Sequence, residues 1–65
     1  METDELLARV GQMAFAIEEG RRPPELTVVV REALEDLAQA GRLPAGDESR
    51  RLILARVARR LDALD

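Results

Sequence analysis

The chain has 65 residues, a formal net charge of −3, 46% apolar and 35% charged residues, and neither cysteine nor histidine. This balance is typical of a globular protein, and the missing residue types exclude disulfides and argue against a structural zinc site. A chain this short buries only about 60% of its unfolded surface, and small scaffolds usually need a further source of stability. Self-association is the source that remains.

Two breaks divide the chain into three segments, and each break starts with a glycine where a helix would end and continues to a proline. The first break runs from Gly20 to Pro24 and the second from Gly41 to Gly46. We therefore expect one small all-α domain over residues 1–65, built as a three-helix protomer. Its helices are predicted at about 4–19, 24–40 and 48–64.

The first predicted helix opens with Thr3 as a candidate N-cap and two acids in the first turn. At 100° per residue its apolar residues form one stripe about 120° wide. The stripe contains Leu6, Leu7, Val10, Met13, Ala14 and Ile17. Phe15, the only aromatic residue of the chain, lies roughly opposite this stripe.

The second predicted helix starts with Pro24 at its first position. Its stripe contains Leu26, Val29, Val30, Ala33, Leu34, Leu37 and Ala40, whereas Val28 falls on the far side. The run from Thr27 to Val30 favours β structure, so a short strand over 26–30 is an open alternative. The long i, i+3, i+4 pattern favours helix.

The third predicted helix has Asp47 as its N-cap. Its stripe contains Ile53, Leu54, Val57, Leu61 and Leu64, and Leu52 lies away from it. Phe15, Val28 and Leu52 thus each stand on the polar side of an amphipathic helix. Single exposed apolar residues are normal, but one on every helix favours a second buried face. We interpret them as the protein interface of an intertwined or face-packed homodimer, with Phe15 the strongest candidate because aromatic residues are enriched in interface cores.

The last helix is basic, and its arginines are candidate contacts to an anion or a nucleic acid. The candidates are Arg50, Arg56, Arg59 and Arg60. Neighbouring acids and a pI near 4.9 favour a solvated face instead, so binding of nucleic acid is not expected. A strand at 26–30 followed by two helices would match the ribbon-helix-helix outline, a dimeric DNA-binding fold, although its outward residues would be apolar apart from Thr27.

No constellation predicts catalysis, a metal site, a cofactor or a small-molecule ligand. Histidine, the usual acid–base group near neutral pH, is absent, and adjacent carboxylates such as Glu18 and Glu19 point in different directions on a helix. No apolar run is long enough to span a membrane, and the acidic first residues are unlike a signal peptide. We expect a cytoplasmic protein that is not an enzyme.

Several segments resemble the YejL family of small bacterial proteins. The matching segments are Leu6-Leu7, the run Arg22-Pro23-Pro24-Glu25-Leu26-Thr27-Val28-Val29-Val30, Leu43-Pro44-Ala45, and Ala55-Arg56-Val57-Ala58-Arg59-Arg60-Leu61. The resemblance covers about Asp4 to Leu64, with a small insertion near Gly46. It implies an all-helical, dimer-forming protein and assigns no activity.

The function hypothesis is therefore a non-enzymatic protein-interaction module: a small accessory, adaptor or regulatory subunit that acts as a helical homodimer. Two alternatives remain open. One is a ribbon-helix-helix-like or antitoxin-like DNA-binding regulator. The other is a subunit of a hetero-complex whose partner is missing.

Overall fold

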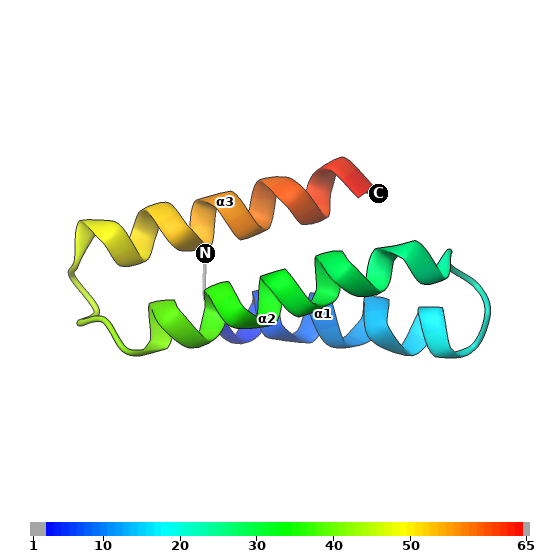
Figure 1. Cartoon of the computed structure of the whole chain (residues 1–65). Coiled ribbons are helices and arrows are strands. Elements are labelled where there is room, and N and C mark those ends of the chain that lie inside the picture. Colours follow the sequence, from blue (N-terminus) through cyan, green and yellow to red (C-terminus); the bar gives the residue numbers. More distant parts are fainter. Residues whose placement is uncertain (1–2, 65) are drawn as a thin grey trace.

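A computed structural model describes residues 3–64 as three helices in which consecutive helices run antiparallel (Figure 1). The elements are α1 (Thr3–Glu18), the 3₁₀ turn η1 (Pro24–Leu26), α2 (Thr27–Gly41) and α3 (Glu48–Leu64). No strand occurs within residues 3–64, so the all-α class is confirmed and the strand alternative at 26–30 is wrong. Residues 1, 2 and 65 of the predicted domain lie outside the described part.

The end of α1 follows the glycine signal in the sequence. Gly20 has a φ of 78°, a left-handed conformation in which a side chain would be strained. The Arg21 amide donates to the Ala16 carbonyl at 2.8 Å and the Gly20 amide to the Ile17 carbonyl at 3.0 Å. This pair of bonds is a Schellman motif, which satisfies carbonyls that the ended helix leaves open. The helix ends at Glu18, one residue earlier than expected.

The end of α2 differs from the expectation. Gly41 is the last residue of the helix and not the left-handed residue after it, and Arg42 follows with a φ of −86°. The Arg42 amide donates to the Gln39 carbonyl and the Leu43 amide to the Ala40 carbonyl, both at 3.1 Å. These 3₁₀-type bonds tighten the last turn and satisfy its carbonyls without a left-handed residue.

The starts of the helices also differ from one another. The backbone amide of Ser49 donates to Asp47 Oδ1 at 2.7 Å, which confirms Asp47 as the N-cap of α3. Pro24 begins the single turn η1, and the α-helical hydrogen bonding of α2 starts only at Thr27. Thr3, expected as an N-cap, is instead the first residue of α1, and its hydroxyl accepts a hydrogen bond from Arg50 at 3.2 Å.

The helices form an elongated bundle that measures 38 × 19 × 17 Å. In Figure 1, α1 and α2 lie side by side in the lower layer, with α2 in front, and α3 lies above them. The core lies where the three apolar stripes meet. It contains Leu6, Val10, Met13, Val30, Ala33, Leu37, Ala40, Ile53, Leu54, Val57, Ala58 and Leu61.

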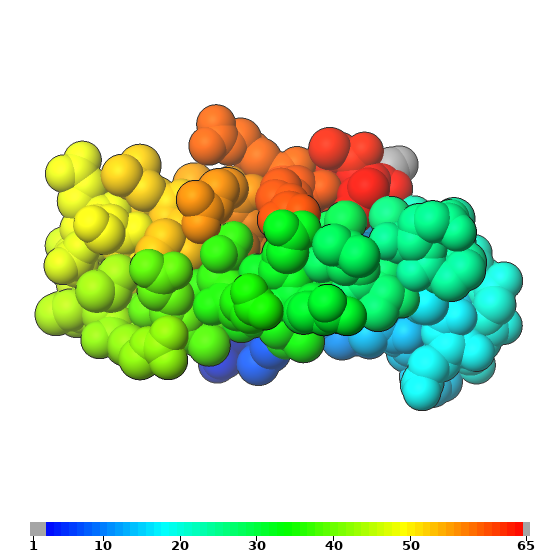
Figure 2. All heavy atoms as spheres, in the orientation of Figure 1, coloured from blue at the N-terminus to red at the C-terminus, as the bar shows by residue number. Residues whose placement is uncertain are grey.

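Two residues of the predicted stripes are not covered. Leu7 is 48% exposed and Leu34 is 44% exposed. The physical reason is that α3 packs on only one side of the α1/α2 pair, so apolar residues on the other side of that pair meet no third helix. Ala58 shows the converse, because it lies outside the predicted stripe of α3 and is nevertheless buried. Figure 2 shows how α2 and α3 cover the front of the molecule.

Candidate interaction surface

The described residues contain no built chemical site. Among residues 3–64 no polar or charged residue is buried, and no three carboxylate, histidine or cysteine side chains gather as metal ligands would. None of the described helices combines the length and the apolar character needed to span a bilayer. The features that stand out are apolar side chains at the surface, which mark interaction sites when they are contiguous.

The three predicted interface residues are all exposed. Phe15 is 56% exposed, Val28 is 54% exposed and Leu52 is 63% exposed. They do not form one patch. Arg50 reaches Thr3 at one end of the bundle, so Leu52 lies near the start of α1, whereas Phe15 lies ten residues further along α1. At 1.5 Å per residue this separates them by about 15 Å along the bundle.

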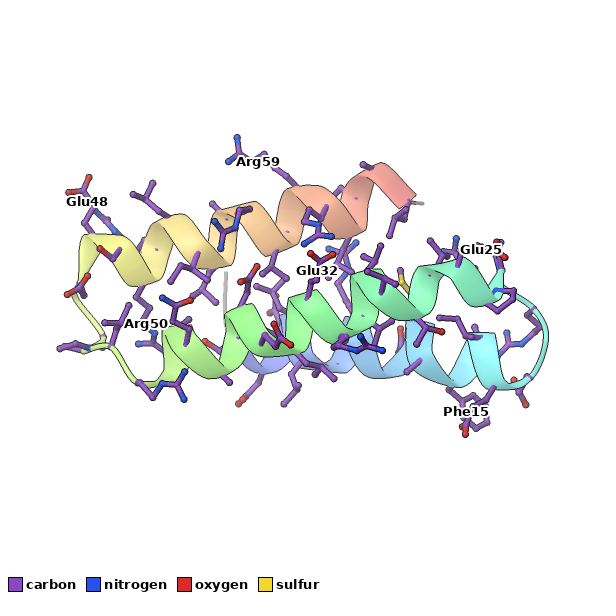
Figure 3. All side chains as sticks on the ribbon, in the orientation of Figure 1. Phe15, Glu25, Glu32, Glu48, Arg50 and Arg59 are labelled. Carbon is purple, nitrogen blue, oxygen red and sulfur yellow. The ribbon has the colours of Figure 1, made fainter. Side chains whose placement is uncertain are left out.

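The two residues also point to different sides. Leu52 lies on α3 about 170° around the helix from the centre of its buried stripe, at 100° per residue, so it points away from α1 and α2. Phe15 projects from α1 on the side away from α3, as Figure 3 shows. A single flat interface therefore cannot contain both. Phe15 lies close to a second apolar feature, which is the groove between α1 and α2.

A surface hollow of about 370 Å³ opens between α1 and α2. It is lined by Ala14, Ile17, Glu18, Thr27 and Val30. Residues at helical spacings from these positions continue the same side of both helices. We call the resulting surface the α1/α2 face, made of Asp4, Leu7, Gly11, Ala14 and Glu18 from α1 and Thr27, Arg31, Leu34, Ala38 and Arg42 from or just after α2.

The other two grooves of the bundle are crossed by ion pairs. Between α2 and α3, Arg56 Nη2 lies 3.1 Å from Asp36 Oδ1, and Arg60 Nη2 lies 3.0 Å from Glu32 Oε1. Between α1 and α3, Arg9 lies 2.9 Å from Asp62. The charged residues of the α1/α2 face form no ion pair with any residue from 3 to 64. The face therefore combines exposed apolar side chains with charged side chains that have no ion-pair partner among the described residues.

Most of the arginines proposed as anion contacts are used within the bundle. Arg56 and Arg60 pair with acids of α2, and Arg50 donates to the Thr3 hydroxyl while its Nε is shielded from solvent without a hydrogen-bond partner among the described residues. Arg59 points outward from α3 (Figure 3). The four arginines therefore do not present a common basic surface.

Sequence reasoning missed Leu7 and Leu34 as surface residues because both belong to the apolar stripes. A signal for them was nevertheless present. The stripe of α1 is about 120° wide, which is more than the seam that one neighbouring helix covers. Leu7 lies at the edge of that stripe and not at its centre, where Leu6 and Val10 are buried.

Comparison with models of known protein families, with curated proteins and with solved structures finds no match to the chain. The resemblance to the YejL family therefore stays a prediction.

Proposed function

We propose that this protein is a non-enzymatic interaction module, a small accessory, adaptor or regulatory subunit of the cytoplasm, that works as a helical homodimer. The observation that carries the proposal is the excess of exposed large apolar side chains. Among the described residues these are Leu7, Phe15, Val28, Leu34 and Leu52, each between 44% and 63% exposed.

Energetic considerations support association. A folded chain of this size gains stability from a small core, here twelve buried residues within 3–64, and a second subunit is a common further source of stability. Covering a half-exposed leucine or phenylalanine contributes about 25 cal/mol for each Å² removed from water. A partner that covers several such side chains at once gains this hydrophobic free energy for each of them, and binding then needs no polar or catalytic site. In such an interface arginine–carboxylate pairs at the rim would set orientation more than affinity.

The test is the solution mass by size-exclusion chromatography with multi-angle light scattering. The wild type is expected to elute as a dimer at about 100 μM, and Phe15→Glu is expected to weaken the dimer because the substitution replaces an exposed aromatic side chain by a charge. Ser49→Glu is the matched control, since it adds the same charge at an exposed position in the first turn of α3, where an acid is tolerated. A wild type that stays monomeric and folded at 1 mM refutes the homodimer.

Circular dichroism of the same samples tests the alternative of a missing hetero-partner. A homodimer is expected to unfold in one cooperative thermal transition whose midpoint rises with protein concentration. An isolated subunit of a hetero-complex would instead aggregate or show no cooperative transition. A midpoint that is independent of concentration over a hundredfold range would contradict self-association.

A further inference from the structure

The α1/α2 face has a charge pattern that distinguishes its two helices. Its α1 side carries acids near both ends, Asp4 and Glu18, and its α2 side carries the arginines Arg31 and Arg42. All four side chains are exposed, and none forms an ion pair within residues 3–64. The face thus has one acidic edge on α1 and one edge on α2 with two arginines and Glu35 between them along the helix, and Leu7 and Leu34 lie between the two edges.

We propose that a second copy of this chain covers the α1/α2 face, with a two-fold axis parallel to the helices, so that α1 of each subunit lies against α2 of the other. The inference rests on the proposed homodimer and names its contact face and its orientation. In a two-fold contact the same surface is used twice, so every pairing occurs in two copies. A surface that pairs with itself in this way must be complementary to its own rotated image.

The positions of the charged residues along the bundle axis make the face complementary to its own rotated image. The hollow between the helices places Glu18 beside Thr27, and at 1.5 Å per residue Asp4 lies about 21 Å away, level with the residues that end α2. In the proposed orientation Asp4 faces the partner's Arg42. Glu18 lies about 6 Å along the axis from the partner's Arg31, a separation that the long arginine side chain spans. Each acid therefore meets an arginine, and the dimer contains two copies of both pairs.

The apolar residues are complementary in size as well. By the same spacing, Leu34 lies level with Gly11, and Leu7 lies level with Ala38. When α1 lies on the partner's α2, each leucine faces the small residue of the other subunit. Large residues facing small ones allow two helix pairs to interdigitate at close distance.

The other two-fold orientation fails both conditions. With the axis across the helices, α1 lies on the partner's α1 in the opposite direction, and Glu18 meets the partner's Asp4. Leu34 then meets the partner's Leu34 near the centre of the face. The two acids in contact repel each other, and a leucine that faces a leucine keeps the helices further apart than a leucine that faces a glycine. These differences select the parallel axis.

The area of the face is sufficient for a stable dimer. Interfaces of standard size bury about 800 Å² on each partner, which is between a fifth and a sixth of the 4495 Å² surface of this chain. The outer side of two of the three helices, over a length of about 21 Å, supplies an area of this order. Phe15 lies at the rim of the face, which agrees with its selection as an interface residue.

Charge reversal tests the orientation through the dimer dissociation constant, measured by analytical ultracentrifugation. Arg31→Glu is expected to raise Kd about tenfold, because two rim attractions become repulsions. The double variant Glu18→Arg with Arg31→Glu is expected to return Kd to within about threefold of the wild type. Arg59→Glu is the control, since it makes the same change in net charge on the outer side of α3. Equal Kd values for Arg31→Glu and Arg59→Glu would overturn the proposal.

Gly11→Leu tests the face independently of charge. A Cβ at Gly11 meets no atom within 4 Å in the protomer, so the substitution is compatible with the fold and improves helix propensity. It should nevertheless raise Kd at least a hundredfold, because the new side chain occupies the place of the partner's Leu34. Ala63→Leu, on an exposed position of α3, should leave Kd unchanged.

The outcomes separate the two proposals. A monomeric wild type removes the proposed function together with this inference. A dimeric wild type that tolerates Gly11→Leu and Arg31→Glu keeps the homodimer and refutes this face. The parallel orientation is refuted by a third outcome, in which Gly11→Leu disrupts the dimer but adding Glu18→Arg to Arg31→Glu does not restore the wild-type Kd.

Discussion

Replacement of Leu61 by alanine should destabilise the protein severely, whereas the same replacement at Leu52 should not. Both residues lie on α3, but Leu61 is 2% exposed and Leu52 is 63% exposed. Leucine-to-alanine changes in protein cores cost about 2.7–5 kcal/mol. We expect about 3 kcal/mol, at the lower end, because Leu61 also borders a surface hollow toward which its surroundings can relax.

This cost is large relative to the total. A chain of 65 residues at roughly 0.05–0.15 kcal/mol per residue has an unfolding free energy of about 3–10 kcal/mol. With a urea m-value of about 1 kcal/mol/M, Leu61→Ala should lower the midpoint by about 3 M. Leu52→Ala should change stability by less than about 0.5 kcal/mol.

Urea titrations followed by circular dichroism measure this difference. All variants must be compared at one protein concentration, because the proposed dimerisation would contribute to apparent stability. If the unfolding free energy of the wild type is about 3 kcal/mol, Leu61→Ala should already be partly unfolded without urea, and its titration should then show no folded baseline. Similar midpoints for Leu61→Ala and Leu52→Ala would refute the arrangement of α3 described above.

Three further predictions concern local features. Asp47→Ala should lower stability by about 1 kcal/mol through loss of the N-cap hydrogen bond, seen as a fall of about 4–8 °C in the melting temperature. Gly20→Ala should lower the unfolding free energy by roughly 1–2 kcal/mol, because Gly20 has a left-handed φ. Gly46→Ala should be neutral or slightly stabilising, although a Cβ at either glycine meets no atom within 4 Å. Equal effects of the two substitutions would contradict the left-handed conformation of Gly20. A double-mutant cycle on Glu32 and Arg60, whose hydrogen bond is exposed, should give a coupling of about 0.2–1 kcal/mol that shrinks in 1 M salt. A coupling that is insensitive to salt would argue against a solvent-exposed pair.

The local sequence was sufficient to predict the helices and most of their ends. Asp47 and Gly20 act within a few residues of their own positions, through a side-chain cap and a left-handed turn, so their effect can be predicted without knowledge of the fold. Gly41 shows the limit of such rules, because the last carbonyls of α2 found 3₁₀-type partners and the left-handed turn was not required. Helix ends depend on local hydrogen bonding, and more than one local solution exists.

The candidate interaction surface was only partly predictable. Phe15 stood out because it faces away from its own apolar stripe, and its exposure could be anticipated from helical periodicity alone. Leu7 and Leu34 lie at the edges of their stripes, but periodicity alone did not mark them as exposed. Their spacing places them in the stripes, and periodicity does not say how many neighbouring helices a stripe meets.

The amino-acid sequence by itself determined three amphipathic helices, their approximate ends and an excess of apolar residues over what three helices can cover. The tertiary structure decided which of those residues stay exposed, because α3 packs on one side of the α1/α2 pair and leaves Leu7 and Leu34 on the other. It also decided which charges are used, since arginines of α3 pair with acids of α2 while Arg31 remains at an open face. Periodicity specifies the direction of a side chain relative to its own helix, and only packing specifies what lies in that direction.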